Sequence, residues 1–542
     1  MMLLPELLSR CAERFPDKSA VVSRSEQISF PDLELQSDRV AARLHRLAIG
    51  PGDRVAILHD NSVAAIVFFW GILKSGAQTV DMPTLAGAET LANILRQCRP
   101  KALVTSDKEW KRVMAEIPDA LPCIVFSKND LLHGCKLGHR SFNLLQDICA
   151  EETTACPRLR LDESQVAMIV YTSGTTGQPK GVMLSHHNLI SNLEASNTLM
   201  GLTSEDSILV VVPLHFIHGR MQLLLHTLIG GTVVLSSGFH FPQNVLREIL
   251  EYRVTGFSGV PYHFVNLAEH TDLGRTALPD LRYVLITGGA LSPDALRKVI
   301  DVLPGVAVHL AYGQTEASPR ITYLSPAEVL ARPYSIGRAL PGVQVEILGN
   351  GGCTVLPGSP GEIVVSGPNI MRGYVSGDEV TCGKIDDQGR LHTGDIGTID
   401  DEGYLYISGR QSEMIKSAGE RIFPREIEAI IDAYPGVSES GVLGVSDQLL
   451  GERLVACVVP VADSQVSRDD LRTHCLKSLP FVRTPREFKF VDQLPKTASG
   501  KIDRVRLVSL WAEVASRSTP HQDKTPPTEH ATLAPCATFE AS

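Results

Sequence analysis

Between about residue 50 and residue 312, short β-branched runs alternate with stretches of helical periodicity, and this alternation constrains the fold more than any other feature of the chain. A strand followed by a helix, repeated many times, predicts mostly parallel, doubly wound sheets covered by helices. We therefore expect an α/β fold. The runs expected to form strands are 55–58, 102–105, 166–171, 208–212, 232–235, 283–286 and 306–311.

The rest of the sequence predicts how the chain divides. A single hydrophobic core stops growing at roughly 250–300 residues, so a chain of 542 residues needs more than one domain. Gly- and Pro-spaced strands at 336–407 predict a β-rich subdomain that completes a large N-terminal domain, residues 1–410. We expect a small α+β domain on a hinge at 411–512, followed by a disordered polar tail at 513–542.

Composition excludes several classes of function. A net charge of −10 argues against nucleic acid as the main partner, because a phosphate backbone requires a basic surface. The longest apolar run, residues 63–73, is far shorter than the ~20 residues of a membrane-spanning helix. The 11 cysteines include no Cys-x-x-Cys pair, which favours reduced thiols over disulfides or zinc. We expect a cytoplasmic protein without a membrane span.

The clearest chemical signal is a loop rich in Gly, Ser and Thr that follows the expected strand at 166–171. Such a loop brings backbone N–H groups, hydroxyls and one lysine close to phosphate oxygens without obstruction by Cβ atoms. Its spacing differs from the P-loop pattern Gly-x-x-x-x-Gly-Lys-Ser/Thr, which argues against a P-loop kinase or GTPase. We predict a nucleotide phosphate loop formed by Thr172, Ser173, Gly174, Thr175, Thr176, Gly177 and Lys180.

Four further motifs follow in order along the chain. They are 312–316 (Tyr-Gly-Gln-Thr-Glu), 393–395 (Thr-Gly-Asp), 409–410 (Gly-Arg) followed by 416–422 (Lys-Ser-Ala-Gly-Glu-Arg-Ile), and 495–503 (Pro-Lys-Thr-Ala-Ser-Gly-Lys-Ile-Asp). With the loop, they make the chain resemble the adenylate-forming superfamily of acyl-CoA synthetases, peptide-synthetase adenylation domains and beetle luciferases. The resemblance covers about residues 1–512. It implies an enzyme that uses ATP to convert a carboxylic acid to an acyl-adenylate and pyrophosphate, and then transfers the acyl group.

The resemblance also implies how ATP is bound. Tyr312 is expected to face adenine, Thr315 to contact the α-phosphate, and Glu316 to bind Mg²⁺, which usually takes one or two carboxylates together with phosphate oxygens. Asp395 is expected to accept the ribose hydroxyls, with Arg410 in support. The implied ATP and AMP site is completed by Gly288, Gly313 and Gln314.

In the small domain, the resemblance assigns the catalytic lysine to Lys501, which would bridge the attacking carboxylate and the α-phosphate. Loss of such charge stabilisation commonly costs about 10²–10³ in rate. The small domain is expected to rotate about Ser412 between the two half-reactions, although Asp or Lys is usual at that hinge position. Rotation would present an acceptor channel formed by Lys416, Ser417, Ala418 and Gly419.

The acid pocket is expected around the start of a helix near residue 216. Phe216 corresponds to the residue that gates the carboxylate site in the family, and His218 and Met221 are expected to face the pocket. Relatives that activate amino acids place an Asp nearby for the substrate ammonium, and this stretch has none. A simple small-molecule carboxylic acid is therefore expected rather than an α-amino acid.

Several acceptors remain open. Coenzyme A is the leading expectation, because standalone enzymes of this shape most often use it. The alternatives are an amine or amino acid, giving an amide, and a separate carrier protein. Ala418 stands where luciferases carry a second lysine, which disfavours light-producing oxidation. A non-catalytic acyl-nucleotide-binding regulator is the remote alternative, disfavoured because Glu316 and Lys501 are both present.

Overall fold

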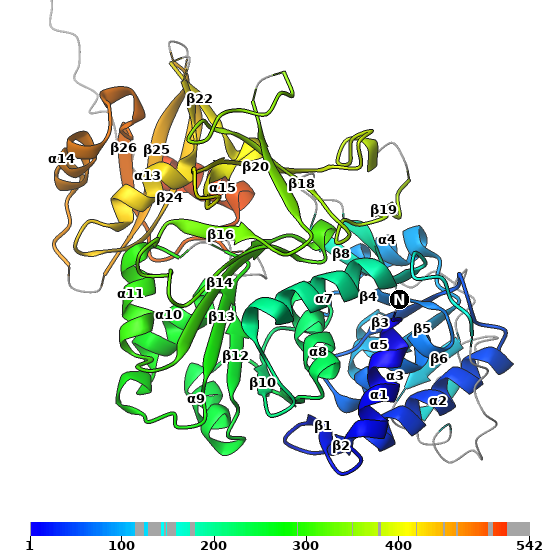
Figure 1. The fold of residues 1–542 in the computed structure, drawn as a ribbon. Coiled ribbons are helices and arrows are strands. Elements are labelled where there is room, and N and C mark those ends of the chain that lie inside the picture. The colour runs from blue at the N-terminus through cyan, green and yellow to red at the C-terminus, as the bar shows by residue number, and fades with distance from the viewer. Residues whose placement is uncertain are drawn as a thin grey trace, which may run out of the picture.

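The computed structural model of the 542-residue chain describes residues 2–113, 124–127, 142–145, 148, 159–173, 179–289, 291–349, 351–377, 381–418, 420–447, 450–461, 464–496 and 502–517. It confirms the α/β class: a large N-terminal domain contains two mixed sheets with parallel cores, and a small C-terminal domain has a sheet of its own (Figure 1). All seven strands expected between residues 50 and 312 are present.

The larger sheet joins the parallel core and the β-rich segment. Six neighbouring strands, from β14 to β1, run parallel, whereas the pairs from β14 to β17 are antiparallel. In spatial order the strands are β17 (Gln344–Leu348), β18 (Gly361–Ser366), β20 (Leu391–Ile399), β21 (Leu405–Arg410), β16 (Ser335–Ala339), β15 (Arg320–Leu324), β14 (Ala307–Gly313), β13 (Tyr283–Thr287), β12 (Gly256–Gly259), β10 (Ser207–Val210), β11 (Thr232–Leu235), β1 (Ser19–Val22) and β2 (Gln27–Ser29).

The second sheet of the large domain carries the predicted phosphate loop at one edge of its parallel core. Strands β8 and β9 form an antiparallel pair that flanks the loop. In spatial order the strands are β19 (Gly373–Tyr374), β9 (Pro179–Ser185), β8 (Val166–Ser173), β4 (Gln78–Asp81), β3 (Arg54–Leu58), β5 (Ala102–Thr105), β6 (Ile124–Ser127) and β7 (Phe142–Leu144).

Helices cover both faces of the larger sheet. Helices α7 and α8 lie between the two sheets, and α9, α10 and α11 cover the opposite face (Figure 1). The helices of the large domain are α1 (Leu4–Arg14), α2 (Phe30–Arg46), α3 (Val63–Lys74), α4 (Ala88–Cys98), α5 (Asp107–Val113), α7 (His186–Met200), α8 (Ile217–Ile229), α9 (Pro242–Glu251), α10 (Pro261–His270) and α11 (Pro293–Asp301).

Helix α3 shows how the sequence builds this core. Its residues from Val63 to Leu73 are apolar on every side, and all of them are buried, as expected for a helix without a polar face. Gly71 lets α2 pack closely, because a Cβ atom there would lie 2.4 Å from Cγ1 of Val40. None of the described helices combines the length and apolar character needed to cross a bilayer.

The small domain packs its helices on a mostly antiparallel sheet. Strand β24 (Val437–Asp447) pairs with β25 (Gly451–Pro460), which also pairs with β26 (Glu487–Phe490) and with the hairpin of β22 (Ile415–Ser417) and β23 (Glu420–Ile422). Its helices are α13 (Pro424–Asp432), α14 (Arg468–Ser478) and α15 (Arg504–Arg517). The expected start of the tail at residue 513 is too early, because α15 continues to Arg517 and anchors itself through buried Leu507 and Trp511. The remainder of the tail, 518–542, lies outside the described residues.

Candidate active site

Strands β20 and β21 bring together the predicted ribose-binding residues. Asp395 and Arg410 are cross-strand neighbours, and Arg410 Nε lies 2.9 Å from Asp395 Oδ1. The Tyr312 hydroxyl at the end of β14 donates to Asp395 Oδ2 at 2.6 Å. Burial and the Asp395 carboxylate raise the pKa of Tyr312 well above its usual value, so the phenol stays protonated and acts as a donor. Three residues from separate motifs therefore lie within hydrogen-bonding or ion-pair distance, and their roles in binding ATP stay predictions.

The direction of the Asp395 carboxylate is fixed by its own strand. The Asp395 backbone N–H donates to Thr393 Oγ1 at 3.0 Å, and that hydroxyl donates to the carbonyl of Ile363 at 2.6 Å. Asp395 is only 4% exposed. A carboxylate has about four lone-pair positions, so Tyr312 and Arg410 leave acceptor capacity for two further donors, the number that a ribose diol supplies.

A second cluster lies around Glu316, in the short helix η3 (Thr315–Ala317) that follows β14. The Tyr374 hydroxyl donates to Glu316 Oε1 at 2.7 Å. Lys180 Nζ lies 5.5 Å from the centroid of the Tyr374 ring, within the range of a cation–π contact. Tyr374 on β19 thus links the predicted phosphate lysine to the predicted metal-binding carboxylate.

The sequence analysis missed Tyr374 and also Lys384. Lys384 Nζ donates to the carbonyl of Thr393 at 2.9 Å, beside the Asp395 cluster. Burial lowers the pKa of Lys384, and the carboxylates of Glu316 and Asp395 oppose that shift, which places its ammonium near both clusters. Tyr374 directly follows a glycine at a strand edge, a weak signal that could have been noticed, whereas no local pattern distinguishes Lys384.

Backbone geometry explains two of the predicted glycines. At Gly313 a Cβ atom would lie 1.8 Å from the carbonyl oxygen of Pro319, so only glycine fits where the chain folds back into β15. Gly288, after β13, has φ +81°, a left-handed conformation that favours glycine. Directly after Gly313, Gln314 donates its backbone N–H to the Pro319 carbonyl at 2.9 Å, which closes the turn that carries Thr315.

The phosphate loop itself is described only at its ends. Thr172 and Lys180 are cross-strand partners on β8 and β9, and the Thr172 hydroxyl lies 3.5 Å from the Lys180 carbonyl. Ser173 ends β8. The predicted residues that lie outside the described part of the chain are Gly174, Thr175, Thr176, Gly177, Gly419 and Lys501.

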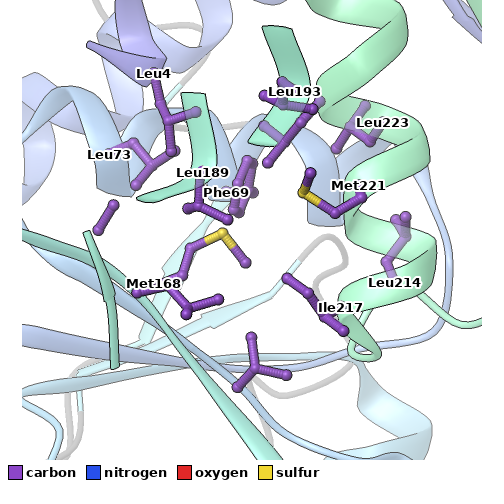
Figure 2. Packing of buried hydrophobic residues seen from close by; sticks show 14 of the residues in the cluster. Leu4, Phe69, Leu73, Met168, Leu189, Leu193, Leu214, Ile217, Met221 and Leu223 are labelled. Atoms are coloured by element: carbon purple, nitrogen blue, oxygen red, sulfur yellow. The ribbon is translucent and has the colours of Figure 1, made fainter. Parts of the chain in front are cut away.

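The three predicted acid-pocket residues differ in their surroundings. Phe216 caps the start of α8 and its ring lies 4.3 Å from that of His215. His218 Nε2 lies 2.8 Å from the Ser258 hydroxyl, and burial lowers the pKa of His218 to about 3, so the ring is neutral near pH 7. Met221 is 1% exposed and packs among core residues such as Met168 and Leu193 (Figure 2). Its role in an acid pocket stays a prediction.

The small domain approaches this region through the residues that flank the predicted catalytic lysine, Lys501. An isolated bridge between Lys496 and Ile502, together with the Asp503 N–H bonded to the Pro495 carbonyl at 2.8 Å, closes the base of the 497–501 loop. Lys496 Nζ lies 5.8 Å from the ring centroid of Tyr262, at the start of α10 in the large domain. Lys496, which immediately precedes residues 497–501, therefore lies beside the large domain.

The predicted hinge and acceptor residues lie on the connection between the domains. Ser412 is exposed in the short helix η4 (Gln411–Glu413), directly after β21. On β22, Lys416 is exposed and Ser417 is buried. Ala418 has φ +51°, so the hairpin turns tightly there. The structure tests neither the hinge role nor the acceptor role.

The donor set suits a magnesium ion held mainly by nucleotide phosphates. Among the residues that the structure describes, His, Cys, Asp and Glu form no cluster of three or more that would bind a metal by itself. Mg²⁺ bound to a nucleotide needs only one or two protein carboxylates, and Glu316 can supply one, since Tyr374 occupies a single lone pair. The residues present therefore fit the ion.

Comparison with protein families decides the assignment. Residues 8–375 match the model of the AMP-binding enzyme family, and residues 426–501 match the AMP-binding enzyme C-terminal domain. The chain belongs to the AMP-binding enzymes. This adenylate-forming superfamily is the one that the motifs predicted.

Named relatives of this AMP-binding enzyme match it over nearly their whole length. A feruloyl-CoA synthase from Amycolatopsis sp is 33% identical, over 91% of this chain and 96% of that protein. An oxalate–CoA ligase from Arabidopsis thaliana is 31% identical, over 92% and 97%. Among solved structures, the amide bond synthetase McbA from Marinactinospora thermotolerans superposes with a TM-score of 0.84 at 27% identity, covering 94% of this chain and 99% of that one.

Proposed function

We propose that the protein is an AMP-forming acid–CoA ligase. ATP would convert a small carboxylic acid to an acyl-adenylate and pyrophosphate, and the thiol of coenzyme A would then attack the acyl carbonyl, forming a thioester and releasing AMP. The observation that carries the first step is the buried Asp395 carboxylate held between Tyr312 and Arg410, with Glu316 and Lys180 in the adjoining cluster.

The proposed roles follow from the positions of these groups. Asp395 accepts the ribose hydroxyls through its remaining lone pairs. Lys180 neutralises phosphate charge, and Glu316 holds a phosphate-bound magnesium ion, which supplies further neutralisation of the pyrophosphate. Thr315 offers its hydroxyl to the α-phosphate. An oxygen of the acid then attacks the α-phosphorus, and the bond to pyrophosphate breaks.

Lys501 is proposed to stabilise the charge that develops on the α-phosphate during this attack. The closed base of the 497–501 loop and the contact of Lys496 with Tyr262 support the role, because they bring the start of the loop to the large domain. Rotation at Ser412 is proposed to withdraw the loop after the first half-reaction. Exposed Lys416 would then contribute positive charge for the phosphates of coenzyme A.

Coenzyme A is preferred as acceptor because the feruloyl-CoA synthase and the oxalate–CoA ligase both use it according to their names, and both align over more than nine-tenths of this chain. The likeness to an amide bond synthetase supports a second candidate, in which an amine replaces the thiol. Adenylation is identical in the two cases.

The deciding experiment supplies enzyme, ATP, Mg²⁺ and a panel of acids with coenzyme A, with a panel of amines, or with neither, and identifies products by mass spectrometry. We expect a thioester and faster AMP release with coenzyme A. Lys416→Met should slow thioester formation while leaving the adenylation step unchanged. An amide, with AMP release indifferent to coenzyme A, would establish the second candidate instead.

A further inference from the structure

A cation lies buried in the large domain without a counter-ion among the described residues. Arg320, the first residue of β15, is 6% exposed. Its Nη1 has no hydrogen-bond partner within the described part of the chain, and no carboxylate there contributes to its electrostatics. Burial lowers the pKa of Arg320 to about 10, so the group still carries its charge near pH 7. An unpaired buried charge is costly, and proteins normally pair it.

The backbone beside this cation is held firmly. The Asn192 side-chain amide donates to the Arg320 carbonyl at 2.7 Å, and the Asn369 amide donates to the Ala317 carbonyl at 3.0 Å and to that of Arg320 at 3.4 Å. Arg320 is also the cross-strand partner of Gly313 in the nucleotide motif. The guanidinium therefore projects from a rigid position next to the adenylation site, which is how binding groups are usually supported.

The polar groups around Arg320 are neutral. Three histidine–hydroxyl pairs lie on the same side of the sheet: His218 with Ser258 at 2.8 Å, His226 with Tyr283 at 3.0 Å, and His309 with Tyr323 at 2.6 Å. Burial, assisted by the Arg320 charge, lowers the pKa of His218 to about 3 and that of His309 to about 4. Burial likewise lowers the pKa of His226 to about 4. These neighbours can hydrogen-bond a ligand, but they do not neutralise the cation.

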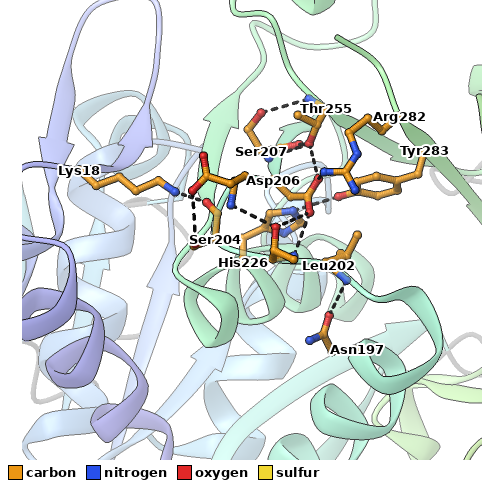
Figure 3. A network of polar contacts seen from close by, with 12 residues as sticks. Lys18, Asn197, Leu202, Ser204, Asp206, Ser207, His226, Thr255, Arg282 and Tyr283 are labelled. Atoms are coloured by element: carbon orange, nitrogen blue, oxygen red, sulfur yellow. Dashed lines mark hydrogen bonds and ion pairs between the residues drawn. The ribbon is translucent and has the colours of Figure 1, made fainter.

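Asp206 is the acidic residue whose charge reaches His226 and Tyr283, but its carboxylate is already paired with other residues. Its carboxylate accepts from the Thr255 hydroxyl at 2.9 Å and pairs with Arg282 at 3.0 Å, beside His226 and Tyr283 (Figure 3). A hollow beside Arg320, lined also by Ser196, Leu285 and Tyr323, is too narrow to hold a water molecule. A ligand group that reaches Arg320 must therefore move side chains aside.

We propose that the acid activated by this enzyme is a dicarboxylate, whose second carboxylate pairs with the Arg320 guanidinium while its first is adenylated. This proposal rests on the proposed adenylation activity. It assigns a substrate class to the acid site predicted around His218, which the charge of Arg320 reaches, and it makes Arg320 the residue that determines specificity. A planar guanidinium suits a carboxylate because it can donate two parallel hydrogen bonds.

The test measures ATP–pyrophosphate exchange with acids in matched pairs, such as suberate against octanoate and terephthalate against benzoate, together with the monomethyl ester of each diacid. We expect the wild-type enzyme to favour the diacid in at least one pair by about 100-fold in kcat/KM. Arg320→Met should abolish that preference, with exchange of the matched monoacid retained or raised, and Arg320→Lys should keep part of it.

Each other outcome overturns the proposal. Equal use of diacid and monoacid by the wild-type enzyme refutes it without requiring any variant to fold. A monomethyl ester used as well as its diacid would show that Arg320 serves a neutral oxygen. Exchange with monoacids alone refutes the substrate class but leaves adenylation intact, whereas absence of exchange with every acid refutes the proposed function itself.

Discussion

The buried ion pair between Asp81 and Arg220 allows a quantitative test of how the large domain is held together. Arg220 on α8 donates to Asp81 at the end of β4 through two bonds, of 2.7 Å and 3.2 Å, and its guanidinium lies 4.0 Å from the centre of the Phe69 ring. Asp81 is 1% exposed and Arg220 is 2% exposed. The pair joins the second sheet to the helix that carries His218.

Replacing Asp81 with Asn removes the carboxylate that pairs with the buried Arg220 guanidinium, which cannot lose its proton. Breaking a buried pair in this way costs about 3–5 kcal/mol, and about 4 kcal/mol corresponds to a roughly 1,000-fold change in the folded-to-unfolded ratio. The chain offers a matched control in Arg253 and Asp280, which form the same two-bond geometry at 3.0 Å and 3.1 Å with Arg253 77% exposed. Asp280→Asn should cost only about 0.2–1 kcal/mol.

The assay is urea unfolding followed by the fluorescence of Trp70 and Trp110, which are both buried in the large domain. Trp511 lies in the small domain, so all variants carry Trp511→Phe. The double variant Asp81→Leu with Arg220→Met should recover most of the lost stability, because it removes both charges from the core. Equal losses for Asp81→Asn and Asp280→Asn, or no recovery in the double variant, would refute the reasoning.

Three further predictions follow from the structure. Burial lowers the folded-state pKa of His226 and of His309 to about 4, below the unfolded value, so the protein takes up protons when it unfolds below pH 7. The free energy of unfolding should therefore fall between pH 7 and pH 5 by about 2 kcal/mol for each histidine. In thermal denaturation His226→Gln should reduce this pH dependence, and an unchanged profile would contradict the reasoning. Tyr312→Phe removes a donor to Asp395 and should raise KM for ATP by about tenfold, whereas an unaltered KM would show that the phenol does not help to hold the ribose-binding carboxylate. Truncation after Arg517 should leave the melting temperature nearly unchanged, whereas truncation after Val505 should lower it sharply because it removes buried Leu507 and Trp511. An equal fall in melting temperature for both truncations would place stabilising contacts beyond residue 517.

The fold and the nucleotide site were predictable to different degrees for physical reasons. Alternating strands and helices produce local patterns, so all seven expected strands are confirmed. Asp395, Tyr312 and Arg410 each belong to a recognisable motif, and the structure brings them together, while their roles in binding ATP stay predictions. The tail boundary was wrong because the amphipathic end of α15 gives little signal beyond residue 512.

The residues that were missed share a different property. Tyr374 and Lys384 matter because of the groups next to them after folding, a carboxylate and a strand carbonyl. Arg320 matters because it has no counter-ion among the described residues. These surroundings exist only in the folded chain, as in the contact of Tyr374 with Glu316, 58 residues away, so no local periodicity or turn signal encodes them. Met221, a helical position next to predicted site residues, is buried among core residues, and its role in the acid pocket stays a prediction.

The central claim, that Asp395, Glu316 and Lys501 form an adenylating site, is tested most directly by acid-dependent ATP–pyrophosphate exchange. The account predicts exchange that requires Mg²⁺ and a carboxylic acid and proceeds without coenzyme A. Lys501→Ala should reduce this exchange by about 10²–10³, while thioester formation from supplied acyl-adenylate is far less affected. No exchange by folded enzyme over a broad panel of mono- and dicarboxylic acids, or an equal loss of both half-reactions in Lys501→Ala, would contradict the account.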